Sequence, residues 1–222
     1  MRHNFAFALL AIGASTAVAS ADTLVTFAYN NLAGTYTPTN ATSGSFGAIA
    51  VDSVGLQTIG DVTRLTVPSG TADFNSGFVS APNPANFVVN VSVDAIDQIL
   101  GLALGTGSFT ITDNDGSTIT GAIDGVWIRG GLGQTFFNGN LTNVNFTGAS
   151  FDGDSGSFST NFGSIANLEG AFTQLLLNPG TGGFFTAGFQ GVATQAQGEI
   201  IPTPGAIALL GIGGLMAARR RR

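Results

Sequence analysis

The sequence predicts an all-β domain, either an antiparallel β-sandwich or a barrel, over residues 22–195. The chain has 222 residues, of which 44% are hydrophobic and 9% are charged, a balance that suits one globular domain with a sizeable core. Short runs of alternating apolar and polar residues recur between clusters of Gly, Asn, Asp and Ser. Runs of this kind, without long helical patterns between them, are typical of antiparallel sandwiches and barrels.

The clearest single strand lies at residues 87–93. Phe87, Val89, Val91 and Val93 recur at a period of two, with Asn90 and Ser92 on the opposite face. This alternation predicts a strand with one face in the core and the other face in water.

The clearest hairpin has its loop at residues 114–116, an Asn-Asp-Gly sequence. A three-residue loop places Ile111 opposite Ile119, whereas a two-residue loop would set Ile111 against a threonine and mix apolar with polar faces. We therefore expect the three-residue loop. In this register Phe109 lies opposite Gly121, where the phenylalanine ring can cover the missing side chain.

A second hairpin is predicted at the dipeptide Asn138-Gly139, which favours a two-residue turn between strands. Such a turn would place Phe136 opposite Leu141. The residues on each side of this turn are apolar enough to form a pair of strands.

Two segments are compatible with either helix or strand. Residues 96–100 could form one helical turn, because Ile96, Ile99 and Leu100 have helical spacing. Residues 165–175 also carry apolar side chains at helical spacing, but a glycine interrupts them, and the run 172–177 suits a strand equally well.

The first 21 residues predict a secretory signal peptide that is removed before Asp22. Arg2 supplies the positive start, Phe5–Ala14 form the apolar run, and the small residues Ala19 and Ala21 stand at the expected cleavage site. An apolar run of this length is short for a membrane-spanning helix.

Composition excludes several chemistries. The chain has no cysteine, and its one histidine, His3, lies in the predicted signal peptide, so a Ser-His-Asp triad, a thiolate nucleophile and an ordinary zinc site are all excluded from the mature domain. Between Asp22 and Glu199 stand thirteen acidic residues against Arg64 and Arg129, a net charge of −11. Such a surface repels nucleic acid, which we therefore do not expect as a partner.

The end of the chain carries a separate pattern. Residues 196–201 read as a stalk, and Pro202-Thr203-Pro204 then predicts an extended, accessible junction, because proline cannot donate a backbone hydrogen bond. The apolar run 205–218 predicts a hydrophobic helix of about 21 Å, which is short for a full membrane span. The chain ends in the arginines Arg219, Arg220, Arg221 and Arg222.

This order of Pro-x-Pro, short apolar segment and terminal arginines resembles the PEP-CTERM sorting signal of Gram-negative bacteria. The resemblance is confined to residues 201–222, with Pro202 and Pro204 matching the motif prolines and Thr203 standing where the family has glutamate. It implies an exosortase-like membrane protease as partner and a precursor anchored in the inner membrane. It also implies a final location at the cell surface or in the extracellular matrix. A plain, uncleaved anchor is the alternative, because an apolar run followed by arginines also satisfies the positive-inside rule.

Two acidic pairs are candidate calcium ligands: Asp113 with Asp115, and Asp152 with Asp154. Calcium takes several oxygen ligands, and each pair is followed within two residues by a glycine that could help to shape a binding loop. Neither pair fits an EF-hand loop. The alternative is that Asp and Asn next to Gly are turn formers that bind nothing. No other cofactor is expected.

The sequence favours an exported, non-catalytic protein of the surface or of an exopolysaccharide matrix, with two alternatives. A carbohydrate-binding module would need exposed aromatic faces, for which Trp127, Tyr29 and Tyr36 are the candidates, although Trp127 between two aliphatic residues favours a place in the core. A polysaccharide-processing enzyme would need two carboxylates about 5–10 Å apart across a cleft. Among thirteen acidic residues some such pair is expected by chance.

Overall fold

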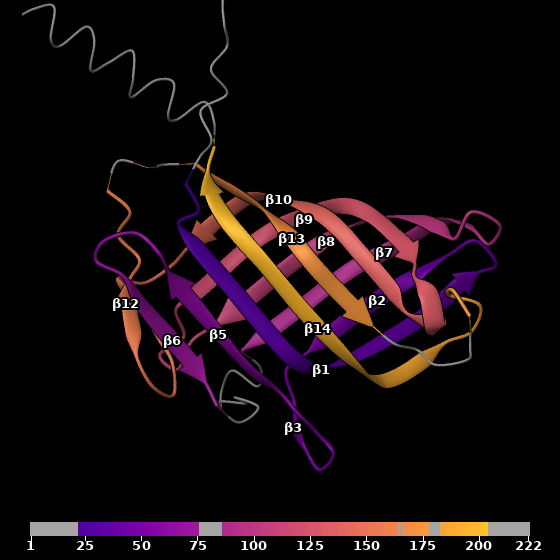
Figure 1. The fold of residues 1–222 in the computed structure, drawn as a ribbon, viewed down its shortest axis with the longest axis horizontal. Coiled ribbons are helices and arrows are strands. Elements are labelled where there is room, and N and C mark those ends of the chain that lie inside the picture. The colour runs from indigo at the N-terminus through magenta and orange to yellow at the C-terminus, as the bar shows by residue number, and fades with distance from the viewer. Residues whose placement is uncertain (1–21, 76–85, 164, 166, 178–182, 204–222) are drawn as a thin grey trace, which may run out of the picture.

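The computed structural model describes residues 22–75, 86–163, 165, 167–177 and 183–203, and these residues form an antiparallel β-barrel (Figure 1). The predicted all-β class is therefore confirmed, and of the two predicted architectures, sandwich and barrel, the structure has the barrel. The predicted signal peptide and C-terminal hydrophobic helix lie outside the described residues. Eight strands close the barrel in the following order, β14 pairing with β1 at the seam: β1 (Val25–Asn40), β2 (Ser43–Ile49), β7 (Phe87–Asp97), β8 (Leu102–Thr112), β9 (Thr118–Arg129), β10 (Thr135–Phe146), β13 (Leu168–Leu177) and β14 (Phe189–Pro202).

Shorter elements are attached to this barrel. Strand β5 (Ile59–Arg64) pairs with the first half of β1, and β6 (Gly70–Phe74) pairs with β5. The hairpin of β11 (Ser150–Asp152) and β12 (Ser157–Ser159) lies against β6, and both appear at the same end of the barrel in Figure 1. The remaining elements are the small hairpin β3 (Asp52–Ser53) with β4 (Leu56–Gln57), and a single 3-10 turn, η1 (Gly131–Gly133).

The barrel has two distinct ends. The terminal end is where β1 begins and β14 finishes, and it also holds the turn at 113–117 between β8 and β9. The far end holds the turns at 97–101 and 130–134 and the residues 183–188 that lead into β14.

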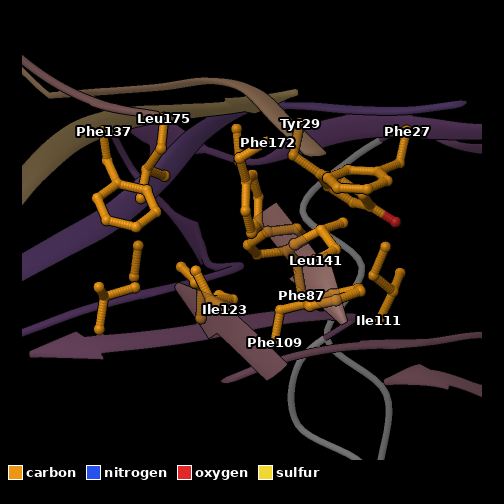
Figure 2. Packing of buried hydrophobic residues seen from close by; sticks show 14 of the residues in the cluster. Phe27, Tyr29, Phe87, Phe109, Ile111, Ile123, Phe137, Leu141, Phe172 and Leu175 are labelled. Atoms are coloured by element: carbon orange, nitrogen blue, oxygen red, sulfur yellow. The ribbon is translucent and has the colours of Figure 1, made fainter. Parts of the chain in front are cut away.

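The barrel interior is filled with aromatic and aliphatic side chains (Figure 2). Along β7 the inward residues Phe87, Val89, Val91 and Val93 are buried, as the alternating pattern predicts. Small closed barrels of eight strands have interiors just wide enough for side chains to fill. The large inward rings are Phe27, Tyr29, Phe46, Phe109, Trp127, Phe137 and Phe172.

Trp127 lies fully inside the barrel, as expected for a core residue. Its indole N–H donates to the backbone oxygen of Ser92 at 2.9 Å, and its ring meets Phe46 edge to face with centroids 5.1 Å apart. Tyr29 and Tyr36 are buried as well, so none of these three rings is offered as a carbohydrate platform.

The hairpin of β8 and β9 has the predicted register. Ile111 is paired with Ile119, and Phe109 is paired with Gly121. A Cβ atom placed on Gly121 would lie 2.5 Å from Cε1 of Phe109, because the ring covers the space that the glycine leaves. The three-residue loop is therefore confirmed.

The predicted hairpin at Asn138-Gly139 is wrong. Both residues lie in the middle of β10, which pairs with β9 on one side and with β13 on the other, so Phe136 and Leu141 belong to the same strand. Gly139 is required here for packing, since its missing side chain leaves room for the ring of Phe137 on the same strand.

The two ambiguous segments are resolved. Residues 168–177 form strand β13. Its register with β14 shifts between Phe172 and Gln174, near the middle of the strand. Ile96 is a buried residue one position before the end of strand β7, whereas Ile99 and Leu100 lie exposed on a tight turn. The Asp97 carboxylate closes this turn by accepting the backbone N–H groups of both Ile99 and Leu100.

Candidate functional site

The two acidic pairs predicted from the sequence meet at the terminal end of the barrel. Asp113 begins the turn between β8 and β9, and Asp152 is the last residue of β11. The Asn114 backbone N–H donates to the Asp152 backbone oxygen at 3.1 Å, and the Asp152 N–H donates to Oδ2 of Asp113 at 2.9 Å. The structure thus brings together loops that are about forty positions apart in the sequence.

The Asp113 carboxylate is fully buried, and both of its oxygens are used inside the protein. Oδ1 accepts the backbone N–H groups of Asp115 at 2.9 Å and of Ser117 at 2.7 Å, while Oδ2 accepts the N–H of Asp152. Three backbone donors stabilise a buried carboxylate strongly. Asp113 therefore holds the hairpin turn in shape and ties it to β11.

Asp152 and Asp154 make separate hydrogen bonds. Oδ2 of Asp152 accepts the hydroxyl of Ser150 at 2.6 Å, and Oδ2 of Asp154 accepts the backbone N–H of Asn75 at 2.9 Å. Within the described ranges, no three side chains of His, Cys, Asp or Glu are grouped in a way that could hold a metal ion. The geometry favours the turn-forming interpretation over the calcium site.

A further pair of carboxylates, not singled out from the sequence, lies on β5 and β6, the two strands attached beside the first half of β1. Asp61 on β5 is paired directly with Asp73 on β6. Partial burial raises the pKa of Asp61, the negative charge of Asp73 raises it further, and the hydroxyl of Thr63, which donates to Asp61 at 3.3 Å, lowers it. Only the cross-strand pairing, which is invisible in the linear sequence, brings the two acids together.

Arg64 is the buried cation of the terminal end, and its role was also not predicted. Its guanidinium donates to the backbone oxygens of Ser159, Asn161 (2.9 Å) and Thr66 (3.1 Å), and lies 4.7 Å from the ring centre of Phe162. These contacts fasten the segment after β12 to β5, because a planar guanidinium can satisfy several carbonyl groups at once. Arg64 thus holds the fold and is occupied by protein atoms.

The far end is closed by Phe184 and Phe185, which precede β14. The ring of Phe185 packs against Trp127 with centroids 5.1 Å apart and against Tyr36 at 4.7 Å. Gln98 donates to the backbone oxygen of Phe184 at 2.7 Å, which fixes this segment to the turn after β7. The sequence signal for this closure is a pair of adjacent phenylalanines after a glycine-rich stretch of the sequence.

The expected stalk over residues 196–201 is wrong, because these residues form the end of strand β14 and pair with both β1 and β13. Pro202 is the last residue of that strand, opposite Leu168, and is buried rather than accessible. The next residue, Thr203, donates its backbone N–H to Asn167 at 3.0 Å. A proline is tolerated at the end of a strand, where its missing donor costs little. The β domain therefore runs to 203 and not to 195.

The two ends of the described domain lie close together. The backbone N–H of Leu24 donates to the oxygen of Ile200 at 2.9 Å, and the hydroxyl of Thr23 donates to Glu199 at 3.0 Å. Asp22, the expected first mature residue, is exposed. The remaining predicted targeting residues lie outside the described residues: Ala19, Ala21, Pro204, Arg219, Arg220, Arg221 and Arg222.

No helix in the described part of the chain is long and apolar enough to cross a membrane. Comparison of the chain with protein families, with curated proteins and with solved structures gives no match.

Proposed function

We propose that this chain is an exported, non-catalytic protein of the bacterial surface or extracellular matrix. In this proposal the tail anchors the precursor in the inner membrane and is then processed by an exosortase-like protease. The observation that carries the proposal is the direct passage from the barrel into the tail. Strand β14 closes the barrel, its last residue Pro202 is buried, and the next residue, Thr203, is hydrogen-bonded to Asn167.

The arrangement of the chain ends supports an anchored precursor. The start of β1 and the end of β14 are neighbours in the sheet, so a signal peptide before Asp22 and a membrane segment after Thr203 leave the barrel at one end. Both segments can then reach the same membrane without crossing the barrel. The far end, with its exposed turns, is directed away from that membrane.

The state of the buried side chains supports a structural rather than a catalytic role. The interior is packed with aromatic rings, and the buried charged groups Asp113 and Arg64 are bound to backbone atoms of neighbouring loops. Such groups are held for stability, whereas a catalytic acid or base must be free to exchange a proton with a substrate.

The test is export in a host that carries an exosortase, followed by intact-mass measurement of the released protein. We expect a species that starts at Asp22 and ends beyond Thr203, because the bonds up to Thr203 are protected within the sheet. The double variant Pro202→Ala, Pro204→Ala should remain in the membrane fraction.

The matched control is Pro38→Ala, which removes a proline from β1 and leaves the tail unchanged. This variant should be released like the wild type. Retention of the wild-type chain in the membrane with Arg222 attached would reduce the tail to a plain anchor and contradict the proposed processing.

A further inference from the structure

The outer face of the barrel is hollowed where β1, β2, β7 and β8 lie side by side. We name this feature the outer hollow; its volume is about 540 Å³. Its central row is Thr35, Gly47, Asn90 and Ser108, which stand opposite one another on the four strands in turn. The surface is hollowed at Gly47 because glycine has no side chain, whereas the other outward positions of this row carry one.

The lining of the outer hollow is uncharged, and it combines polar groups with a larger share of apolar surface, to which Ala33 and Ile49 contribute. Around Gly47 it offers hydroxyl groups and one amide, and none of the described residues that line it carries a charge. Hydroxyl and amide groups both donate and accept hydrogen bonds. The polar side chains are Thr35, Thr37, Ser45, Asn90, Thr106 and Ser108.

Asn90 is free to bind a ligand. Its side-chain amide makes no hydrogen bond with any other described residue, although it stands next to the hollow at Gly47. By contrast, the hydroxyl of Ser92 already accepts the backbone N–H of Thr106 at 3.0 Å. The amide of Asn90 can thus supply both a donor and an acceptor to a molecule lying in the hollow.

Charge selects the class of ligand. The body of the chain has a net charge of −11, so anionic polymers are repelled at long range, while the lining offers no carboxylate to hold a cation. A second copy of this chain carries the same negative charge and is disfavoured for the same reason. A neutral chain of sugar residues, rich in hydroxyl groups, satisfies the lining without meeting that repulsion.

The extent of the outer hollow also suits a polymer. It extends across four neighbouring strands, which is about 14 Å between the first strand and the fourth. We infer that the outer hollow binds a neutral polysaccharide and so fastens the protein to its matrix. This inference rests on the proposed function, since it names the matrix component that the surface protein would hold.

The test uses the full-length chain, purified in a polyoxyethylene detergent that has no sugar headgroup. Its migration is compared in native gels that contain dextran, laminarin, galactomannan or, as anionic polymers, alginate and hyaluronan. We expect retardation by at least one of the neutral polysaccharides and by neither anionic one. Retardation by none of the neutral polymers overturns the inference.

The deciding variant is Gly47→Leu, which fills the hollow. Gly47 does not have the left-handed backbone conformation. A Cβ atom there would meet the movable Oδ1 of Asn90 at 3.0 Å and the backbone oxygen of Val89 at an ordinary contact distance of 3.6 Å, so we expect the barrel to tolerate the change. Ala171→Leu on β13 is the control, because Ala171 is partly exposed and pairs with Asn140 and Glu199, on strands that do not line the hollow. We expect the dissociation constant to rise at least tenfold in Gly47→Leu and to stay unchanged in Ala171→Leu.

Asn90→Ala serves as a second variant, and it should weaken binding although it adds no bulk. Near-ultraviolet circular dichroism and melting curves establish that each variant is folded. Unchanged affinity in folded Gly47→Leu and in Asn90→Ala would place binding elsewhere and overturn the inference. The proposed function would still stand in that case, because it fails on a different result, namely failure of the chain to be exported and released.

Discussion

At the scale of single residues, Asp113 shows how a sequence motif for metal binding can instead be a structural device. Its carboxylate is buried and accepts three backbone N–H groups from two loops. Metal binding would require it to give up some of these donors. The acidic pairs are therefore better explained by the turn at 113–117 and by its attachment to β11.

Replacing Asp113 by alanine should destabilise the barrel strongly. The change leaves three backbone donors without their acceptor, and we expect a loss of about 3 kcal/mol and a fall in melting temperature of roughly 10 °C. Thermal unfolding followed by circular dichroism measures this. Asp115→Ala, which removes an exposed carboxylate from the same turn, should change little.

The same melting experiment tests calcium. Neither addition of calcium nor addition of a chelator should shift the melting temperature of the wild-type chain, since Asp113 is already satisfied by the backbone. A rise with calcium that disappears in Asp115→Ala would restore the calcium site.

Asp61 should make stability depend on pH. Its pKa is raised above the ordinary value of 3.8 in the folded state, so the folded chain holds that proton more tightly than the unfolded chain. The resulting stabilisation is complete below pH 3.8 and is lost as pH rises through the raised pKa. Asp61 therefore carries a small penalty at neutral pH.

Asp61→Asn should accordingly stabilise the protein at pH 7, by less than about 1 kcal/mol because solvent screens a half-exposed group. The gain should vanish near pH 3, where the wild-type carboxyl is protonated as well. Urea unfolding at the two pH values measures the difference, with the exposed Asp94→Asn as control. An equal gain at both pH values would contradict the electrostatic origin.

At the scale of elements, the seam between β1 and β14 is the part of the fold that the sequence did not reveal. The pair of prolines near the end suggested a break and a stalk, but proline disfavours only hydrogen bonding through its own nitrogen. The residues before it, up to Ile201, alternate between buried and partly exposed positions as a strand requires. A partner for that strand lies at the opposite end of the sequence, and local patterns carry no signal for such a pairing.

Truncation distinguishes a stalk from a strand. A chain that ends at Thr203 retains every described strand and should fold, whereas a chain that ends at Gln195 loses the partner of residues 25–29 and opens the barrel. We expect cooperative unfolding and resistance to protease in the first chain only. Equal behaviour of the two chains would support the stalk.

Strands with clear alternation and loops with a specific turn chemistry were predictable, as β7 and the turn at 114–116 illustrate. The failure at Asn138-Gly139 has a physical reason. The dipeptide favours a turn locally, but pairing of β10 with a strand on each side, and the need for space beside Phe137, prevail over that preference. Similarly, Asp61 lies opposite Asp73 because strands β5 and β6 pair, and the spacing of residues along either strand does not predict this contact.

At the scale of the whole molecule, the barrel presents different surfaces at its two ends. Loops fastened by Asp113 and Arg64 cover the terminal end, while exposed aliphatic side chains stand on the turns of the far end. Ile99 and Leu132 are 95% and 98% exposed there. They contribute little to the core despite their size.

The double variant Ile99→Ser, Leu132→Ser should therefore keep the wild-type melting temperature, within about 0.5 kcal/mol of stability. Ile96→Ser is the matched change at a buried position nearby, with 7% exposure, and should cost about 3 kcal/mol. Equal effects of the two variants would show that the far-end turns are packed in solution.

The seam also has a consequence for the order in which the molecule can form. Its contacts join residues as far apart as Thr23 and Glu199, 176 positions along the chain, so the barrel has a high contact order. One edge of strand β1 stays unpaired until strand β14 is added to the sheet. A polypeptide crossing a membrane from its N-terminus cannot complete such a barrel until residue 203 has emerged. The same open edge can pair with β14 of another molecule when many chains emerge together, so we expect strand exchange as a form of misassembly.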